Sequence, residues 1–201
     1  MDSINYKFSI FPAGWWDEKK QEVVMNQRPQ QTVSLDWVYR YIRSDSARKA
    51  TEEFRELPEN ATKLEKRQFK ILNFMHATFS GTFSYRNAKS LISQTRYRII
   101  DIDGLPSIEV ARGLQDMLCR DPYVETLLAF VSPSARGVKW IVNQPEWTQG
   151  MTFKQQIDSL IMHVEFHYGI APDTTGCDIC RTCFLPWDSE CYINKKFTIN
   201  P

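Results

Sequence analysis

The sequence has 201 residues, of which 42% are hydrophobic and 13% aromatic, and its formal net charge is +1. This composition is typical of a globular protein with a substantial core, and the near-zero charge excludes binding of nucleic acid through a general basic excess. No apolar run approaches the roughly 18 residues of a membrane helix, and the first residues lack the pattern of a signal peptide. The cysteines are odd in number, five, which argues against a complete disulfide framework. We therefore expect a cytoplasmic protein with no membrane partner.

The first part of the chain predicts a strand, a turn-rich segment and a long helix. Residues 6–12 alternate as a strand does, and residues 13–31 are polar and rich in turn formers. Ser34 can cap a helix over residues 35–57, which has apolar positions at helical spacing. Residues 63–70 are highly charged, and we interpret them as a solvated face rather than a binding site.

The remaining elements alternate between strands and helices. The pattern predicts strands at 77–83 and 96–103, a short helix at 88–94, a helix from Ser107 to Cys119, a hairpin of 124–132 with 138–143, and a helix up to Tyr168 that begins with a capping box of Thr152 and Gln155. The order strand, helix, hairpin, helix predicts an α+β fold with an RNA-recognition-like or ferredoxin-like sheet in residues 96–201. Residues 1–95 would be an N-terminal elaboration packed on that core.

Two carboxylates end the apolar strand RIIDIDGL. Asp101 and Asp103 are two residues apart, so in a strand they lie on one face while Ile100 and Ile102 face the other way. Adjacent carboxylates repel each other unless a cation lies between them, and hard divalent ions such as Mg²⁺ prefer oxygen ligands. The alternative interpretation is a strand end with two solvated acids.

A basic hairpin turn, SPSARGVKW, follows. It brings Ser134, Arg136 and Lys139 close together in the sequence. A turn rich in Ser and Gly exposes backbone N–H groups, and two cations beside it attract phosphate. An ordinary basic loop is the alternative.

A third motif lies in the cysteine-rich segment 173–194. Asp173 or Asp178 can add a third carboxylate, and Arg181 can bind a carboxylate or a phosphate through two hydrogen bonds. An Asp–Arg ion pair that holds the loop together is the alternative.

Together, ATFSGTF, IIDIDGL, SPSARGVKWIV and the final D…D..R.CF…D…YIN run resemble the archaeo-eukaryotic primase superfamily. More closely, they resemble the N-terminal domain family of virulence-associated protein E (VirE), found ahead of helicase-like regions in bacterial mobile elements. The resemblance covers about residues 77–194. It implies a primase–polymerase type core that carries out two-metal nucleotidyl transfer in replication.

The resemblance also implies roles for individual residues. Asp101 and Asp103 would be catalytic and would bind Mg²⁺ or Mn²⁺. Asp173 would be the third catalytic acid, since its distance from Arg181 fits primase-like sequences better, and Asp178 is the other candidate metal ligand.

The nucleotide-binding residues implied in the same way are Ser134, Arg136, Lys139 and Arg181. The implied partners are a nucleoside triphosphate, single-stranded DNA and a helicase-like domain or protein. The sequence departs from the primase pattern at Lys139, where a histidine is usual, and at Ala135, where a glycine is usual. An inactive nucleotide- or nucleic-acid-binding module is therefore the alternative function.

The last candidate is a metal site made of cysteines. Cys177, Cys180, Cys183 and Cys191 form C-x2-C-x2-C-x7-C, and thiolates at such spacing can hold Zn²⁺ or an iron–sulfur cluster. His163 and His167 lie one turn apart on a predicted helix and can complete a Cys2His2 set with the first two cysteines. Neither spacing fits a known site cleanly and buried free cysteine is common, so we take packing as the main interpretation and a cysteine-based metal protein as a third hypothesis.

Overall fold

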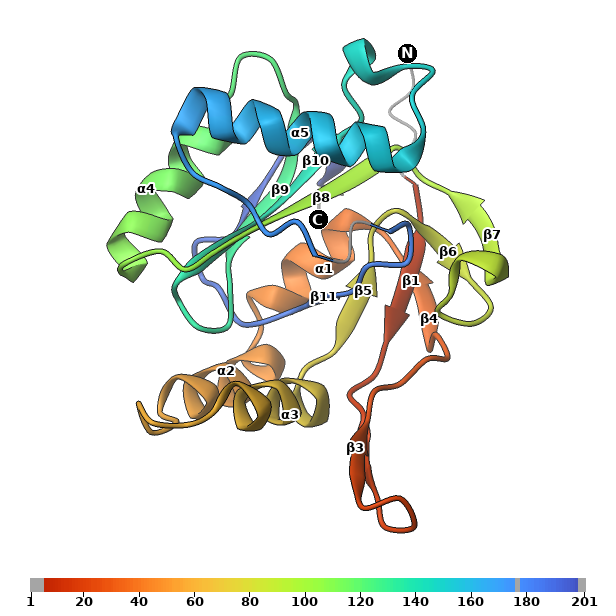
Figure 1. The fold of residues 1–201 in the computed structure, drawn as a ribbon, viewed down its shortest axis with the longest axis vertical. Helices are drawn as coiled ribbons and strands as arrows, with labels where there is room; N and C mark the ends of the chain where they lie inside the picture. Colours follow the sequence, from red (N-terminus) through yellow and green to blue (C-terminus); the bar gives the residue numbers. More distant parts are fainter. Residues whose placement is uncertain (1–5, 176–177, 199–201) are drawn as a thin grey trace.

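The computed structural model describes residues 6–175 and 178–198, which contain two four-stranded antiparallel sheets (Figure 1). The first sheet has the order β11–β5–β1–β4, with β1 at Phe8–Phe11, β4 at Gln31–Val33, β5 at His76–Thr78 and β11 at Cys183–Phe184. The second has the order β12–β9–β10–β8, with β8 at Tyr97–Asp103, β9 at Thr126–Val131, β10 at Gly137–Asn143 and β12 at Tyr192–Ile193. Two further hairpins pair β2 (Trp15–Asp17) with β3 (Glu22–Val24), and β6 (Gly81–Phe83) with β7 (Leu91–Gln94).

Two helices cover one face of the second sheet (Figure 1). They are α4 (Ile108–Cys119) and α5 (Phe153–Tyr168). The Ser107 hydroxyl accepts a hydrogen bond from the Val110 N–H, and the capping box at the start of α5 is formed by Thr152 and Gln155. Both predicted helix starts are therefore confirmed, as is the predicted end of α5.

The other face of the second sheet packs against the first sheet and α1 (Leu35–Ile42). This core joins apolar side chains from both sheets and the helix, including Phe8, Val38, Ala77, Phe130 and Ile141. Because β11 extends a sheet otherwise made of residues before 80, the two predicted parts of the chain share one sheet and one core.

The predicted helix at 35–57 is wrong in one respect, because it is broken. It divides into α1 and α2 (Asp45–Arg55) at Arg43 and Ser44. The Ser44 hydroxyl donates to the Tyr41 carbonyl at 2.7 Å, so a local side-chain hydrogen bond competes with the continuing helix. Residues 63–70, read as a solvated charged face, belong to α3 (Lys63–Asn73).

Two other predicted elements also differ. The strand expected at 77–83 is divided between β5 and β6, because Ser80 turns away and bonds the Tyr97 carbonyl. The helix expected at 88–94 is a single 3-10 turn, Ala88–Ser90, followed by β7. Short 3-10 turns also occur at Glu146–Thr148 and Lys195–Phe197.

The α+β fold class is confirmed by this architecture. Within the described ranges, no helix has the length and apolar character needed to span a bilayer.

Candidate functional site

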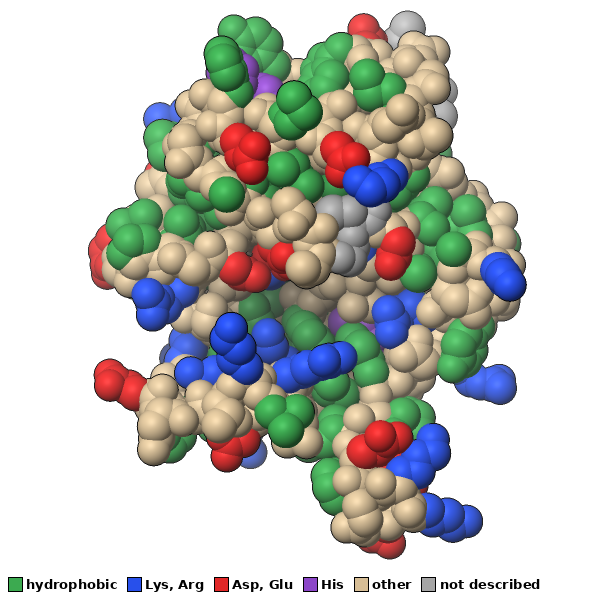
Figure 2. Space-filling view, viewed as in Figure 1, with side chains coloured by type: hydrophobic (Ala, Val, Ile, Leu, Met, Phe, Trp, Pro, Cys, Tyr) green, Lys and Arg blue, Asp and Glu red, His purple; other side chains and the backbone are tan. Residues whose placement is uncertain are grey.

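A pocket of about 240 Å³ lies between the second sheet, the α2–α3 pair and the segment that leads into β11. Its walls carry the acids Asp101, Asp103 and Asp173 and the cations Lys70 and Lys139. Figure 2 shows Lys and Arg side chains along the edge of α2–α3 that faces this hollow. Asp and Glu side chains lie across the hollow from them. The pocket thus collects charges of both signs from distant parts of the sequence.

The acidic pair and Lys139 lie on neighbouring strands. Asp101 and Asp103 project from the face of β8 opposite Ile100 and Ile102, which pack against α4 and α5. Lys139 on β10 is directly paired with Asp101 in the sheet register. Its ammonium group bonds the Asp101 carboxylate and lies 3.4 Å from Asp103 Oδ1. A single cation therefore bridges the two acids.

Asp173 reaches the same place through its backbone. Its N–H donates to the Asp101 carbonyl at 2.8 Å, which holds residue 173 beside β8. Arg181 Nη2 lies 2.9 Å from Asp173 Oδ2 and 3.2 Å from Asp101 Oδ2. Asp173 Oδ1 accepts hydrogen bonds from the backbone and hydroxyl of Thr175. Asp173 thus belongs to the cluster of pocket acids.

Asp178, the other candidate for the third acid, is exposed. Its carboxylate accepts a hydrogen bond from the Cys180 N–H at 2.9 Å and so closes a local turn. It is not among the residues that line the pocket.

The β9–β10 turn forms the mouth of the pocket. Ser134 lines it, with its hydroxyl 3.1 Å from that of Ser132. Exposed Arg136 donates from Nε to the Leu105 carbonyl at 2.9 Å. Gly137 is required here, because a Cβ at this position would lie 2.5 Å from Asp103 Oδ1.

Ala135 departs from the glycine expected in this turn, and its φ of +59° lies in the left-handed region that favours glycine. The turn therefore keeps a glycine-like backbone at a non-glycine residue.

The electrostatics of the pocket follow from burial and close charges. Burial lowers the pKa of Lys139 to about 8. Burial also raises the pKa of Asp103, and the Asp173 carboxylate adds to the rise. For Asp173 the effect of burial is outweighed by hydrogen bonds from Thr175 and Arg181, so its pKa is lowered.

Lys70 is a pocket residue that sequence reasoning missed, because residues 63–70 were interpreted as a solvated face. It lies in the last turn of α3, where burial lowers its pKa and the charge of Asp103 acts in the opposite direction. Its ammonium group lies 5.7 Å from the centre of the Phe184 ring. The available signal was the helical spacing of Lys63, Lys66, Arg67 and Lys70.

The oxygens of the pocket acids are held by protein cations. Within residues 6–175 and 178–198, no three His, Cys, Asp or Glu side chains are arranged to hold a metal ion. At this site Lys139 bonds one carboxylate oxygen of Asp101 and Arg181 bonds the other. The donor set suits a hard divalent ion by its chemistry, but these carboxylates are already compensated.

The cysteine motif remains a prediction. Cys177 lies outside the described residues. Cys183 and Cys191 are buried in the core, and burial raises the pKa of Cys183 to about 11 and of Cys180 to about 11. High thiol pKa values oppose the thiolate form that binds metal.

The two histidines proposed to join that motif lie on α5. His163 Nε2 lies 2.6 Å from Asp121 Oδ2, and the ring centres of His163 and His167 are 4.5 Å apart. His163 is thus bonded to a carboxylate and packed among aromatic rings, including those of Trp140 and Trp147.

Four aromatic residues, Trp15, Trp16, Tyr97 and Trp140, are candidates from the sequence for stacking on bases, although packing in the core is the more common role of such side chains. Trp140 and Tyr97 are buried, at 0% and 1% exposure, so they belong to the core. Trp15 and Trp16 on β2 are about half exposed, at 48% and 47%, and remain candidates.

Comparison with known families corrects the resemblance drawn from the motifs. The family model described as "BT4734-like, N-terminal domain" matches residues 70–193, more than half of the chain. This is a different family from the VirE N-terminal domain, and no match supports membership of the primase superfamily. The short motifs misled because acids, a basic turn and an arginine in that order are not specific to one family. No curated protein and no solved structure matches the chain.

Proposed function

Since the chain belongs to the family of BT4734-like, N-terminal domains, a name that specifies no chemistry, we propose a function from the pocket itself. The pocket binds the phosphate groups of a nucleotide together with a divalent cation, and nucleotidyl transfer is the reaction that this arrangement would support. The observation that carries the proposal is the meeting of Asp101, Asp103 and Asp173 with Lys70, Lys139 and Arg181 in one cavity.

The cations of the pocket support phosphate binding. Lys139 and Arg181 present charged donors beside the carboxylates, and Lys70 and Ser134 line the same walls. Charged N–H donors are the usual partners of phosphate oxygens. A volume of about 240 Å³ is smaller than the roughly 300–1,000 Å³ of sites that enclose a whole small molecule. The pocket would hold the phosphates and leave the base and sugar outside.

The ion pairs make phosphate and cation binding interdependent. When phosphate oxygens take over the N–H donors of Lys139 and Arg181, the oxygens of Asp101 and Asp173 become free as ligands. A divalent cation bound there would offset charge on the phosphate oxygens during transfer. Each ligand then strengthens binding of the other, by the reciprocity of linked equilibria.

The strand order supports an RNA-recognition-like or ferredoxin-like sheet as part of this proposal. The segment β8–α4–β9–β10–α5 places β10 between β8 and β9, with both helices on one face, as in such a sheet, whereas the fourth strand, β12, lies beside β9 and not beside β8. The opposite face packs against the first sheet and α1 over much of its area, and Asp101, Asp103 and Lys139 lie on the part of that face that lines the pocket.

A second candidate function is a nucleotide- or nucleic-acid-binding module without catalysis. The observation that favours it is that Lys139 forms ion pairs with both acids of β8 and is in direct register with Asp101 across the sheet. If Lys139 does not leave the carboxylates, they stay neutralised and phosphate binds without a cation. A helicase-like partner and a role in DNA replication belong to the same proposal.

The experiment that tests the proposal is calorimetric titration of a non-hydrolysable nucleoside triphosphate, with and without Mn²⁺ or Mg²⁺. We expect the divalent ion to strengthen binding by at least about tenfold. Asp101→Asn should abolish that gain because it removes a charged ligand. Asp158→Asn, which changes an exposed carboxylate on α5, is the matched control and should keep the gain.

Catalysis is tested by primer extension on single-stranded template with labelled nucleotides and Mn²⁺. Product from the native chain and none from Asp101→Asn/Asp103→Asn would support nucleotidyl transfer. Nucleotide binding that is independent of divalent ions and unchanged in Asp101→Asn would contradict the cation site and leave the binding module as the function.

A further inference from the structure

We propose that a basic rim, formed by Lys63, Lys66 and Arg67 of α3 with Arg136 of the β9–β10 turn, binds the phosphodiester backbone of a single-stranded nucleic acid. The proposal rests on the proposed function of the pocket, because the rim ends at that pocket through Lys70. It adds a second ligand, a polynucleotide, and names the surface that holds it.

The positive charges of α3 lie in one stripe. Lys63, Lys66, Arg67 and Lys70 are spaced i, i+3, i+4 and i+7, so they lie along one face of the helix. Over seven residues the stripe is about 10 Å long. It therefore runs directly away from the pocket rather than around the helix.

The rim cations are not paired with acidic side chains. Among the described residues, Lys63, Lys66, Arg67 and Arg136 take part in no ion pair. Glu65 lies between these cations in the sequence but outside the stripe, and its carboxylate accepts hydrogen bonds from the N–H and hydroxyl of Thr62 in the capping box.

Other exposed helical cations differ in this respect. Lys49 pairs with Glu53 and Lys154 with Asp158, each one turn further along its helix. The net charge of the chain is only +1, so the rim is a local exception that suits a polyanion.

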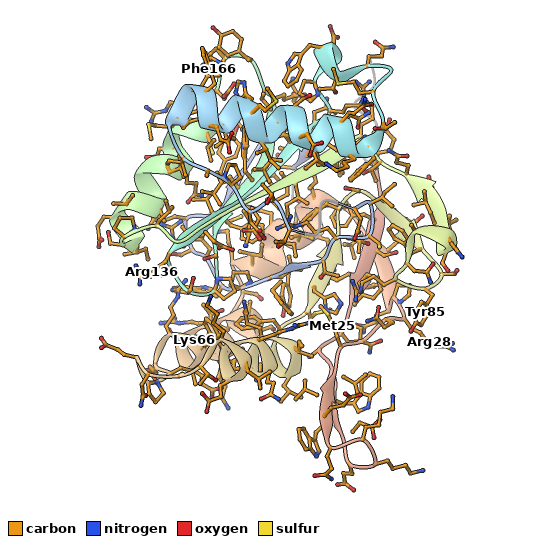
Figure 3. All side chains as sticks on the ribbon, in the orientation of Figure 1. Met25, Arg28, Lys66, Tyr85, Arg136 and Phe166 are labelled. Atoms are coloured by element: carbon orange, nitrogen blue, oxygen red, sulfur yellow. The ribbon has the colours of Figure 1, made fainter. Side chains whose placement is uncertain are left out.

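The rim borders the hollow that leads to the pocket. Figure 3 shows Lys66 and Arg136 on the two sides of the hollow, one on the helix pair and one on the hairpin turn. A chain of phosphates between them would lie over the mouth of the pocket. Its end would then reach the acids and the bound nucleotide.

Exposed aromatic rings favour a single strand over a duplex as the ligand. The β2–β3 hairpin begins at the end of α3, where the Gly14 N–H donates to the Ile71 carbonyl at 2.7 Å. It carries Trp15 and Trp16, both about half exposed. These rings therefore lie by the pocket end of α3, where a strand that follows the rim toward the pocket would arrive, and unpaired bases stack on such rings.

The test is fluorescence anisotropy with a labelled oligothymidylate of about 20 nucleotides, over a range of salt concentrations. We expect Lys63→Gln/Lys66→Gln/Arg67→Gln to weaken binding by at least about tenfold. The slope of log K against log salt should become shallower by about 2, because each lost phosphate contact removes roughly 0.7. Lys70 is left intact, since it belongs to the pocket.

The matched control is Lys49→Gln/Lys154→Gln/Lys196→Gln, which removes the same charge from exposed lysines that already have acidic partners. It should change the affinity by less than about twofold. Equal loss of affinity in the two triple variants, or no loss in the rim variant, overturns the proposal. Tighter binding of a duplex of the same length overturns the single-strand assignment.

Failure of the rim and failure of the pocket are distinguishable. The rim variant should still bind a nucleoside triphosphate in the titration above, whereas Asp101→Asn should still bind the oligonucleotide. If Asp101→Asn loses both ligands while the rim variant loses neither, the polynucleotide is held by the pocket and the rim proposal is wrong.

Discussion

At the scale of single residues, His76 stands out because it is buried without a hydrogen-bond partner. It lies on β5, is 1% exposed, and its ring stacks on Phe11 with 4.9 Å between ring centres. Among the described residues neither ring nitrogen has a partner in hydrogen-bonding geometry. Burial lowers the pKa of His76 to about 4, and the charge of Arg86 adds to the lowering. The folded protein therefore keeps this ring neutral.

This neutral histidine predicts loss of stability in acid. Between pH 6.5 and about 4 the unfolded chain binds a proton at His76 and the folded chain does not, so the free energy of unfolding decreases as the pH falls. The full difference is worth about 3 kcal/mol. Urea unfolding at several pH values should show this decrease in the native chain and a smaller decrease, by about this amount, in His76→Leu.

The comparison uses slopes against pH, so any change in packing caused by leucine does not affect it. His167→Gln, at an exposed position on α5, is the control and should keep the native slope. Parallel curves for the native chain and His76→Leu would show that the ring is protonated in the folded protein.

The spacing of residues within a single strand or hairpin was enough to predict part of the site. Strand alternation places Asp101 and Asp103 on one face, and the hairpin places Lys139 near them, as the structure has it. Lys70 was not predicted because its place in the pocket depends on how α3 packs against residues more than thirty positions away. Spacing within one element finds a pair of acids, but it does not find the partner that another element brings.

At the scale of elements, Asp188 connects the segment between β11 and β12 to three other elements. Its carboxylate is buried, bonds Arg112 on α4, and accepts from the Val131 N–H at 2.8 Å. Its own N–H donates to the Ile42 carbonyl at the end of α1. Asp188, the last acid of the final sequence motif, therefore has a structural role, because it holds α4, β9 and α1 together.

Removing this carboxylate should be strongly destabilising. We expect Asp188→Ala to lower the free energy of unfolding by about 3–5 kcal/mol, because Arg112 loses its partner and the Val131 N–H is left unpaired. Urea denaturation measures the change, with Asp158→Ala at an exposed position as the control.

The double variant Arg112→Met/Asp188→Leu tests the cause. It should recover part of the loss, since it leaves no unpaired charge. A double variant as unstable as the sum of the two single variants would assign the loss to packing instead of to the ion pair.

Element boundaries were predictable where a cap is written into the sequence. The starts of α4 and α5 follow from Ser107 and from Thr152 with Gln155. The break at Ser44 was not predicted, since serine caps a helix or continues it depending on tertiary contacts. The short strands β11 and β12 have two residues each, so they carry no periodicity and exist only through pairing with β5 and β9.

At the scale of the whole molecule, residues before 70 complete the first sheet. The family match begins at residue 70, but β5 pairs with β1, and α1 supplies Leu35, Val38 and Ile42 to the shared core. The fragment of residues 70–201 should therefore not fold alone, because it exposes β5 and half of that core. Circular dichroism should show no cooperative thermal transition, whereas the full chain shows one.

A cooperative transition in that fragment, at a temperature close to that of the full chain, would contradict the prediction. The full chain, measured under the same conditions, is the control and should show that transition.

The pairing of β5 with both β1 and β11 has a consequence for biosynthesis. Cys183 and Phe184 form one wall of the pocket and also the last strand of the first sheet. During synthesis on the ribosome, one edge of β5 therefore stays unpaired until about a hundred further residues have been added and β11 emerges. Such distant pairing makes folding slow and exposes a strand edge meanwhile. The pocket forms only when the sheet is closed, so a nascent or truncated chain lacks it.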